Sequence, residues 1–259
     1  MKLRVTLVQQ SLQWESPEAN LASFEQKLAP LEGRTDLVVL PEMFTTGFSM
    51  NAAALAEPPG GKSAQWLVSM ARRLDAAVTG SLITNDAGQR YNRLHWATPD
   101  GQIVCYDKRH LFRLSGEHER YTPGRTARLV EWRGFRVCPL VCYDLRFPVF
   151  SRRTPELDYD LLVYVANWPK PRVDAWSTLL KARAMENQAY VVGVNRIGTD
   201  AHGNAHTGQS AAVDFLGRPL VDAGSEPAVL TTELDLRLLA EFRERFPAHL
   251  DADRFTLQT

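Results

Sequence analysis

The sequence has few cysteines, no excess charge of either sign and no long apolar run. Its 259 residues include three cysteines, Cys105, Cys138 and Cys142, which are too few and odd in number for a disulfide framework. Thirty basic residues balance thirty acidic ones, which removes the usual electrostatic attraction to nucleic acid or an anionic membrane. No segment is long and apolar enough for a membrane span, and residues 1–6 lack the apolar region of a signal peptide. We therefore expect a cytoplasmic protein with no nucleic-acid or membrane partner.

Strand-like and helix-like patterns alternate along the whole chain. Strand patterns fall at residues 3–9, 36–40, 77–84, 91–98, 102–106, 135–142, 160–166, 190–195, 209–213 and 228–234. Helical spacing of apolar residues falls at residues 17–31, 63–74 and 174–188. There is no low-complexity stretch, linker or short-period repeat. The pattern predicts one α/β domain over residues 1–259, with sheets inside, helices outside and a C-terminal extension from about residue 240.

Four polar or reactive side chains come directly after apolar strands. They are Glu42, Cys142, Asn167 and Asn195. In α/β proteins, ligands gather at the carboxyl ends of strands, because helices begin there and side chains converge. We expect the functional site at this edge.

Three other motifs do not support a function. Residues 60–63 resemble the end of a phosphate-binding loop, but Ala56 stands where its first glycine is required. His202 and His206 are four residues apart, but Gly203 lies between them and no helix is predicted, so a solvated glycine-rich loop is favoured over a metal site. The chain also lacks the Gly-x-Ser-x-Gly pattern of many serine hydrolases.

Cys142, Glu42 and Lys108 each allow a structural and a catalytic interpretation. Cys142 lies where a buried strand ends and a helix is expected to begin. The exposed N–H groups and the dipole of that helix would favour the thiolate form of Cys142. The equal alternative is that Cys142 is only a small buried hydrophobic side chain. Glu42 ends another buried strand and must be paired or functional. Lys108 lies in a charged segment, and taken alone it is an ordinary solvated charge.

Together these segments resemble the three catalytic motifs of the nitrilase (carbon–nitrogen hydrolase) superfamily. The matching stretches are Pro-Glu-Met-Phe at 41–44, Tyr-Asp-Lys-Arg-His-Leu at 106–111 and Val-Cys-Tyr-Asp-Leu-Arg-Phe-Pro at 141–148. They occur in the family's order, and the rhythm of strands and helices fits from residue 1 to about 245. The resemblance implies an αββα sandwich with two central sheets flanked by helices. It implies no cofactor and no metal, because a cysteine supplies the nucleophile.

The chemistry explains why these residue types occur together. A cysteine that attacks an amide carbonyl needs a base, and Glu42 is expected to take the proton of Cys142. The resulting oxyanion needs hydrogen-bond donors, which Lys108 and the backbone N–H of Tyr143 would supply. Glu42 would then protonate the leaving nitrogen and activate the water that hydrolyses the thioester. The predicted enzyme is therefore an amidase of the Glu-Lys-Cys type.

Family members often carry a second glutamate before a Pro-Gly turn. Glu117 and Glu119 both precede Pro123 and Gly124. Counting back from Gly124 favours Glu117, which we expect to orient Lys108 or the incoming water. Glu119 stays open as an alternative, and either residue is also compatible with an exposed charge in a polar loop.

Two further segments, 112–119 and 167–172, resemble the bacterial omega-amidase branch of the superfamily. Members of that branch deamidate monoamides of dicarboxylates such as 2-oxoglutaramate and 2-oxosuccinamate. The alternative is an N-carbamoyl-amide hydrolase of the same superfamily. A different class, a catalytically silent scaffold on the same fold, is disfavoured because the Glu, Lys and Cys positions are all present.

The small amide substrate needs a pocket and a cation for its carboxylate. Arg146 is the sequence candidate for the cation, although it also fits a structural ion pair. Phe44, Phe48, Tyr143 and Trp168 are candidates for the pocket walls, and each is also compatible with core packing. The resemblance further implies a homodimer or a larger homo-oligomer, with residues 146–153 and 242–255 as interface candidates.

Overall fold

The computed structural model describes residues 1–257, so the last two residues of the predicted domain lie outside the described part. Two six-stranded sheets form the centre. One has the order β14 (Ala228–Asp235), β1 (Lys2–Gln9), β2 (Leu37–Val39), β3 (Ala77–Asp86), β4 (Gln89–Ala97), β5 (Ile103–Asp107). The other has the order β13 (Pro219–Asp222), β12 (Ala211–Val213), β9 (Tyr190–Asn195), β8 (Leu161–Ala166), β7 (Phe135–Val141), β6 (Val130–Trp132).

Each sheet has a parallel centre and antiparallel edges. Strands β1, β2 and β3 run parallel, as do β7, β8 and β9. These central strands are buried on both faces, which explains their continuous apolar runs. A separate two-stranded ribbon of β10 (Ile197–Thr199) and β11 (Ala205–Thr207) follows β9. Within residues 1–257, no helix has the length and apolarity needed to cross a membrane.

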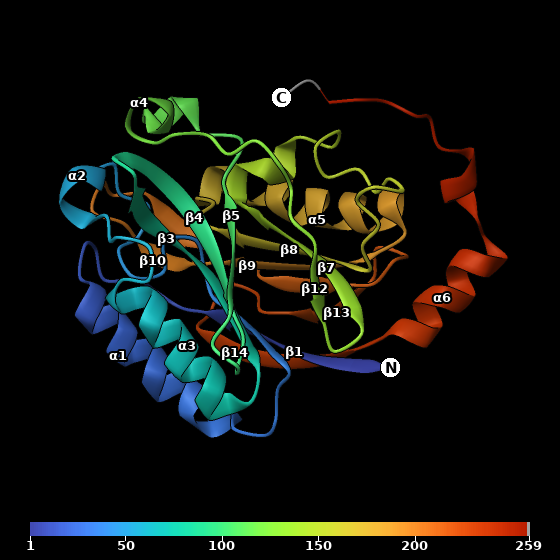
Figure 1. Cartoon of the computed structure of the whole chain (residues 1–259), viewed down its shortest axis with the longest axis horizontal. Coiled ribbons are helices and arrows are strands. Elements are labelled where there is room, and N and C mark those ends of the chain that lie inside the picture. The colour runs from blue at the N-terminus through green and yellow to red at the C-terminus, as the bar shows by residue number, and fades with distance from the viewer. Residues whose placement is uncertain (258–259) are drawn as a thin grey trace.

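Helices cover the outer faces of the two sheets. Figure 1 shows α1 (Pro17–Leu28) and α3 (Lys62–Leu74) beside the first sheet and α5 (Val173–Asn187) beside the second. The shorter segments are α2 (Ala52–Leu55), α4 (Glu117–Arg120), α6 (Leu236–Arg245) and the 3-10 helices η1 (Ala29–Leu31), η2 (Arg113–Ser115), η3 (Cys142–Arg146), η4 (Lys170–Arg172) and η5 (Ala248–Asp251). The predicted αββα sandwich is confirmed.

Two clusters of buried apolar side chains fill the space between these layers. The larger combines residues of both sheets, such as Leu7 of β1 and Val163 of β8, with the inner side of α5. The smaller lies between the first sheet and its helices, where Phe24 packs near Leu67. Because both faces of each sheet are covered, the carboxyl ends of the central strands are the open edge at which polar groups can meet.

The predicted helices and strands lie where the structure has them, but some of their predicted end residues differ from the observed ones. The helix predicted over 17–31 stops at Leu28 and ends as the single 3-10 turn η1. The helix expected after Cys142 is also only a 3-10 segment of five residues, η3. In Figure 1, α6 lies at the edge of the sheets, and residues 246–257 continue beyond it.

Candidate active site

Glu42 and Lys108 meet at the carboxyl ends of β2 and β5. The Nζ of Lys108 donates to Oε1 of Glu42 at 2.8 Å, although 66 residues separate them. Neither side chain has any exposed surface. Burying a lone charge is costly, so a fully buried lysine at this position requires acidic partners. The ion pair therefore brings together the motif at residues 41–44 and the motif at residues 106–111.

Glu117, at the start of α4, is the second partner of this lysine. Both of its carboxylate oxygens lie 2.9 Å from Lys108 Nζ, and Oε2 also accepts from the backbone N–H of Phe112 at 2.6 Å. Glu119 is different, because 67% of its side chain is exposed and the nearest basic side chain recorded for it is His118, with Nε2 3.9 Å from the carboxylate. The structure therefore places Glu117, and not Glu119, beside Lys108.

The charges of this cluster depend on one another. Although burial alone lowers the pKa of a lysine, the carboxylates of Glu117 and Glu42 raise the pKa of Lys108 well above its usual value. Burial and the charge of Glu42 raise the pKa of Glu117, and Lys108 opposes this effect. Lys108 is therefore a permanent cation that can stabilise negative charge developing next to it.

Cys142 lies at the end of β7 and lines a cavity. Its backbone φ is +48°, a left-handed conformation that costs free energy in a residue with a side chain and that occurs often at functional sites. Burial, followed by the charge of Glu42, raises the pKa of the Cys142 thiol well above its usual value, while Lys108 opposes the shift. The thiolate expected from a helix dipole is thus wrong for the protein without substrate. The five-residue η3 is too short to offset the burial of the sulfur.

Asp144, which the sequence did not single out, ties the lysine segment to the cysteine turn. Its carboxylate accepts hydrogen bonds from the Tyr106 hydroxyl at 2.7 Å, the Val141 N–H at 3.0 Å and the His110 N–H at 3.0 Å. Nδ1 of His110 lies 2.8 Å from the same carboxylate. Asp144 has no exposed surface. Two loops that carry Lys108 and Cys142 are therefore held by one buried side chain.

Two asparagines complete the surroundings of Glu42. Asn92 of β4, which the sequence also missed, donates to Glu42 at 2.8 Å and to Glu117 at 3.1 Å. Asn167, which follows β8 as predicted, donates to the backbone carbonyl of Glu42 at 2.6 Å. Asn195 lies further back and holds Trp168 through its side-chain oxygen and nitrogen. The expected convergence of strand ends is confirmed for these residues.

The cavity in front of Cys142 has a volume of about 390 Å³. Four of the five predicted substrate-binding residues line it, namely Phe48, Tyr143, Arg146 and Trp168. The prediction for Phe44 is wrong. That side chain is fully buried and packs against Phe24 and Trp66 in the core, outside the cavity lining.

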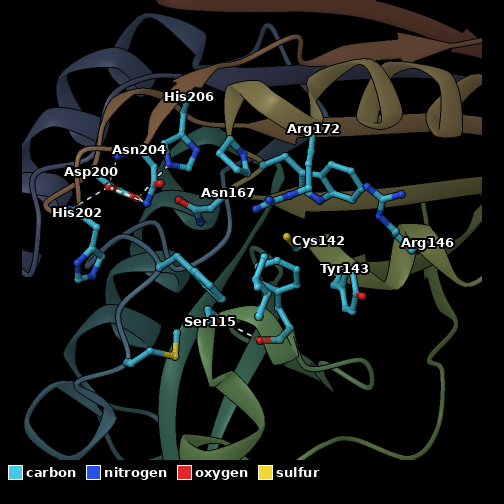
Figure 2. A pocket seen from close by; sticks show the side chains of 16 residues that line it. Ser115, Cys142, Tyr143, Arg146, Asn167, Arg172, Asp200, His202, Asn204 and His206 are labelled. Carbon is cyan, nitrogen blue, oxygen red and sulfur yellow. Dashed lines mark hydrogen bonds and ion pairs between the residues drawn. The ribbon is translucent and has the colours of Figure 1, made fainter.

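Part of the cavity wall comes from residues that the sequence did not assign to the site. Figure 2 shows Asp200, His202, Asn204 and His206 of the β10–β11 ribbon facing the cavity. The prediction of a solvated loop is therefore wrong for His206, which is only 7% exposed and whose Nε2 lies 3.3 Å from Asp200. Arg172 of η4 is a further wall residue. Residues 1–257 contain no group of three or more His, Cys, Asp or Glu side chains arranged to hold a metal ion.

Comparisons with known proteins give a consistent result. The family model described as "Carbon-nitrogen hydrolase" matches residues 4–244. The chain is 50% identical to the omega-amidase YafV of Yersinia enterocolitica, with 98% of each sequence covered. It is 34% identical to the 2-oxoglutaramate amidase of Bacillus subtilis, with 97% of this chain and 98% of that protein covered. The structure of XC1258 from Xanthomonas campestris, a CN-hydrolase superfamily protein with an arsenic adduct in its active site, matches all of the chain with a TM-score of 0.97 and 48% identity.

Proposed function

Because the chain belongs to the carbon–nitrogen hydrolase family, we propose that it is an omega-amidase that releases ammonia from monoamides of dicarboxylic acids, such as 2-oxoglutaramate and 2-oxosuccinamate. The observation that carries the mechanism is the buried Lys108, held between Glu42 and Glu117 beside the cavity that Cys142 lines. A cysteine, a carboxylate and a cation in one buried cluster are the groups that amide hydrolysis through a thioester requires.

In the first half of the proposed reaction, Glu42 acts as the general base. The raised pKa of Cys142 means that the sulfur carries its proton until substrate arrives. As the sulfur attacks the amide carbon, its proton passes to Glu42, and the carbonyl oxygen becomes an oxyanion. The Lys108 ammonium and the backbone N–H of Tyr143 stabilise that oxyanion. Glu42 then gives the proton to the leaving nitrogen, so ammonia departs and a thioester remains on Cys142.

The second half of the reaction regenerates the thiol. Glu42 takes a proton from a water molecule, whose oxygen attacks the thioester carbon, and the proton then returns to the sulfur. Lys108 stabilises the second oxyanion as it did the first. In this proposal Glu117 is a positioning residue, because it contacts Lys108 and the Phe112 backbone. Phe48, Tyr143, Arg146 and Trp168 surround the substrate.

The test measures ammonia release from 2-oxoglutaramate by wild type, Cys142→Ala and Cys138→Ala. Cys138 is a buried core cysteine outside the cavity lining, so its variant is the matched control. We expect Cys142→Ala to lower kcat by at least about 10⁴-fold, since no other group can form the covalent intermediate. An N-carbamoyl amino acid, tested in parallel, should be a poor substrate. Equal ammonia release by wild type and Cys142→Ala would refute the cysteine mechanism, and a preference for the carbamoyl compound would assign the alternative substrate class.

We further propose that residues 1–259 form one domain, that the protein is a homodimer or larger homo-oligomer, and that it is cytoplasmic. Exposed apolar side chains in both predicted interface segments support assembly, among them Val149, Phe246 and Leu250, which are 51%, 60% and 75% exposed. Free thiols at all three cysteines support a reducing compartment. Light scattering after size exclusion tests the assembly, which a monomer would contradict, and cell fractionation tests the location, which a secreted protein would contradict.

A further inference from the structure

Two arginines in the wall of the cavity lack an acidic partner. Arg172 of η4 has its guanidinium carbon 5.0 Å from the ring centre of Phe112, and Arg146 of η3 lies 4.9 Å from the ring of Trp168. Within residues 1–257, neither guanidinium forms a salt bridge or donates a hydrogen bond to a protein group. Each is held against an aromatic face, where a cation is stabilised without being neutralised. The two guanidinium groups therefore keep N–H donors that a molecule bound in the cavity can use.

The nearest acid in the cavity wall does not fill this role. Asp200 accepts from the backbone N–H groups of His202 and Asn204, each at 2.9 Å, and from the side chains of Asn204 and His206 at 3.0 and 3.3 Å. Its carboxylate is thus already satisfied within the β10–β11 ribbon. In Figure 2, Asp200 and His202 lie on one side of Cys142 and Arg146 lies on the other, with the Arg172 side chain between. The cavity therefore has a cationic part with which an anionic group of a ligand can pair.

We propose that Arg172 binds the carboxylate at the far end of the substrate and thereby selects monoamides of dicarboxylic acids. This inference rests on the proposed function and names the residue that sets its substrate class. Arg presents a planar set of N–H donors that matches the two oxygens of a carboxylate. The face of Phe112 fixes the plane of the guanidinium before the substrate arrives, which lowers the entropy cost of binding.

The backbone around Arg172 supports this role. Arg172 ends a six-residue segment that begins at Asn167, whose side chain contacts Glu42. A hydrogen bond of 3.0 Å from the Arg172 N–H to the carbonyl of Pro169 closes η4 within this segment. One short, hydrogen-bonded piece of chain therefore connects the reacting groups to the cation. This segment therefore fixes the distance between the reacting groups and the guanidinium, which must match the distance between the amide and the carboxylate of the substrate.

The kinetic test compares glutaramate with pentanamide, which have equal length and differ in one carboxylate replaced by a methyl group. The ratio of kcat/KM for glutaramate over pentanamide measures carboxylate recognition. We expect Arg172→Met to lower this ratio about 100-fold and Arg172→Lys to lower it less, since lysine keeps the charge without the paired donors. Lys170→Met is the matched control, because Lys170 is an exposed cation of the same 3-10 helix outside the cavity wall. An unchanged ratio in Arg172→Met, or a loss confined to Arg146→Met, would overturn the proposal.

A binding measurement separates this inference from the proposed function. The Cys142→Ala protein cannot form the thioester, so its affinity for glutarate, measured by calorimetry, does not depend on amidase activity. We expect adding Arg172→Met to weaken glutarate binding about 100-fold. If wild type hydrolyses pentanamide as well as glutaramate while glutarate binding still requires Arg172, the proposed substrate class fails and the carboxylate site stands. If glutarate binds equally with and without Arg172, or does not bind at all, the carboxylate site fails.

Discussion

Replacing Glu117 by glutamine tests whether the second carboxylate holds Lys108, the proposed oxyanion-stabilising cation, in place. Glutamine has nearly the same shape but only one oxygen and no charge. The carboxylate of Glu117 accepts from Lys108 at 2.9 Å through each oxygen, from the Phe112 N–H at 2.6 Å and from Asn92 at 3.1 Å. An amide oxygen can serve one side of this arrangement. The amide NH₂ must then face either the lysine ammonium or the Phe112 N–H, and both are donors.

The size of the effect follows from these contacts. Losing one charge-assisted hydrogen bond and leaving one buried donor without an acceptor costs roughly 3–4 kcal/mol together. If that cost falls on the oxyanion-stabilising position of Lys108, kcat falls by roughly 10²–10³-fold, as for the loss of an oxyanion donor. KM should change little, because Glu117 does not line the cavity.

The assay is steady-state ammonia release, with the unfolding midpoint in urea measured on the same preparations. Glu119→Gln is the matched control, since 67% of the Glu119 side chain is exposed and it contacts neither Lys108 nor Glu42. We expect that control to keep the wild-type kcat. A Glu117→Gln enzyme with wild-type kcat, or two variants with equal losses, would refute the assigned role of Glu117. If kcat falls only in proportion to the fraction of protein that is unfolded, Glu117 has a structural role only.

Two further predictions concern stability. Asp144→Ala leaves the Tyr106 hydroxyl and two backbone N–H groups buried without an acceptor. We expect a loss of about 4 kcal/mol in unfolding free energy by urea denaturation, and a loss under about 1 kcal/mol would contradict the network. Burial lowers the pKa of His95 from its usual 6.5 to about 4, so between these values the unfolded chain binds a proton that the folded chain excludes. Unfolding free energy should therefore fall as pH drops through this window, by about 3 kcal/mol from His95 alone. His95→Gln should flatten that part of the pH profile, and equal slopes in both proteins would count against it.

The catalytic candidates were predictable because their signals are local. Glu42 and Cys142 each follow an apolar strand, and strand ends can be located from a few neighbouring residues. Lys108 was recognised from its motif. The motif resemblance then grouped the three residues, and in the structure Lys108 lies 2.8 Å from Glu42. Counting from a Pro-Gly turn also favoured Glu117 over Glu119, and the structure places Glu117 beside the lysine.

The error at Phe44 has a specific physical cause. Met43, between Glu42 and Phe44, has a left-handed backbone with φ of +43°. The chain therefore turns sharply after Glu42, and Phe44 points back into the core against Phe24. Residues two apart on a regular strand would share a face. The left-handed φ of Met43 places Glu42 and Phe44 on different sides instead. Nothing in the sequence indicates this conformation, because Met43 is not a glycine.

Periodicity and short motifs in the chain were sufficient for the αββα class and for locating the residues that we propose as nucleophile, base and cation. The cavity and the ionisation of its groups were decided only by the tertiary structure. Asp200 and His206 reach the cavity through a ribbon far along the chain from Cys142. Arg172 becomes a candidate only because no carboxylate of residues 1–257 pairs with it. The Cys142 thiol keeps its proton because burial and Glu42 act on it together. Burial and unpaired charge are sums over neighbours that are distant in sequence, so they exist only once the chain has folded.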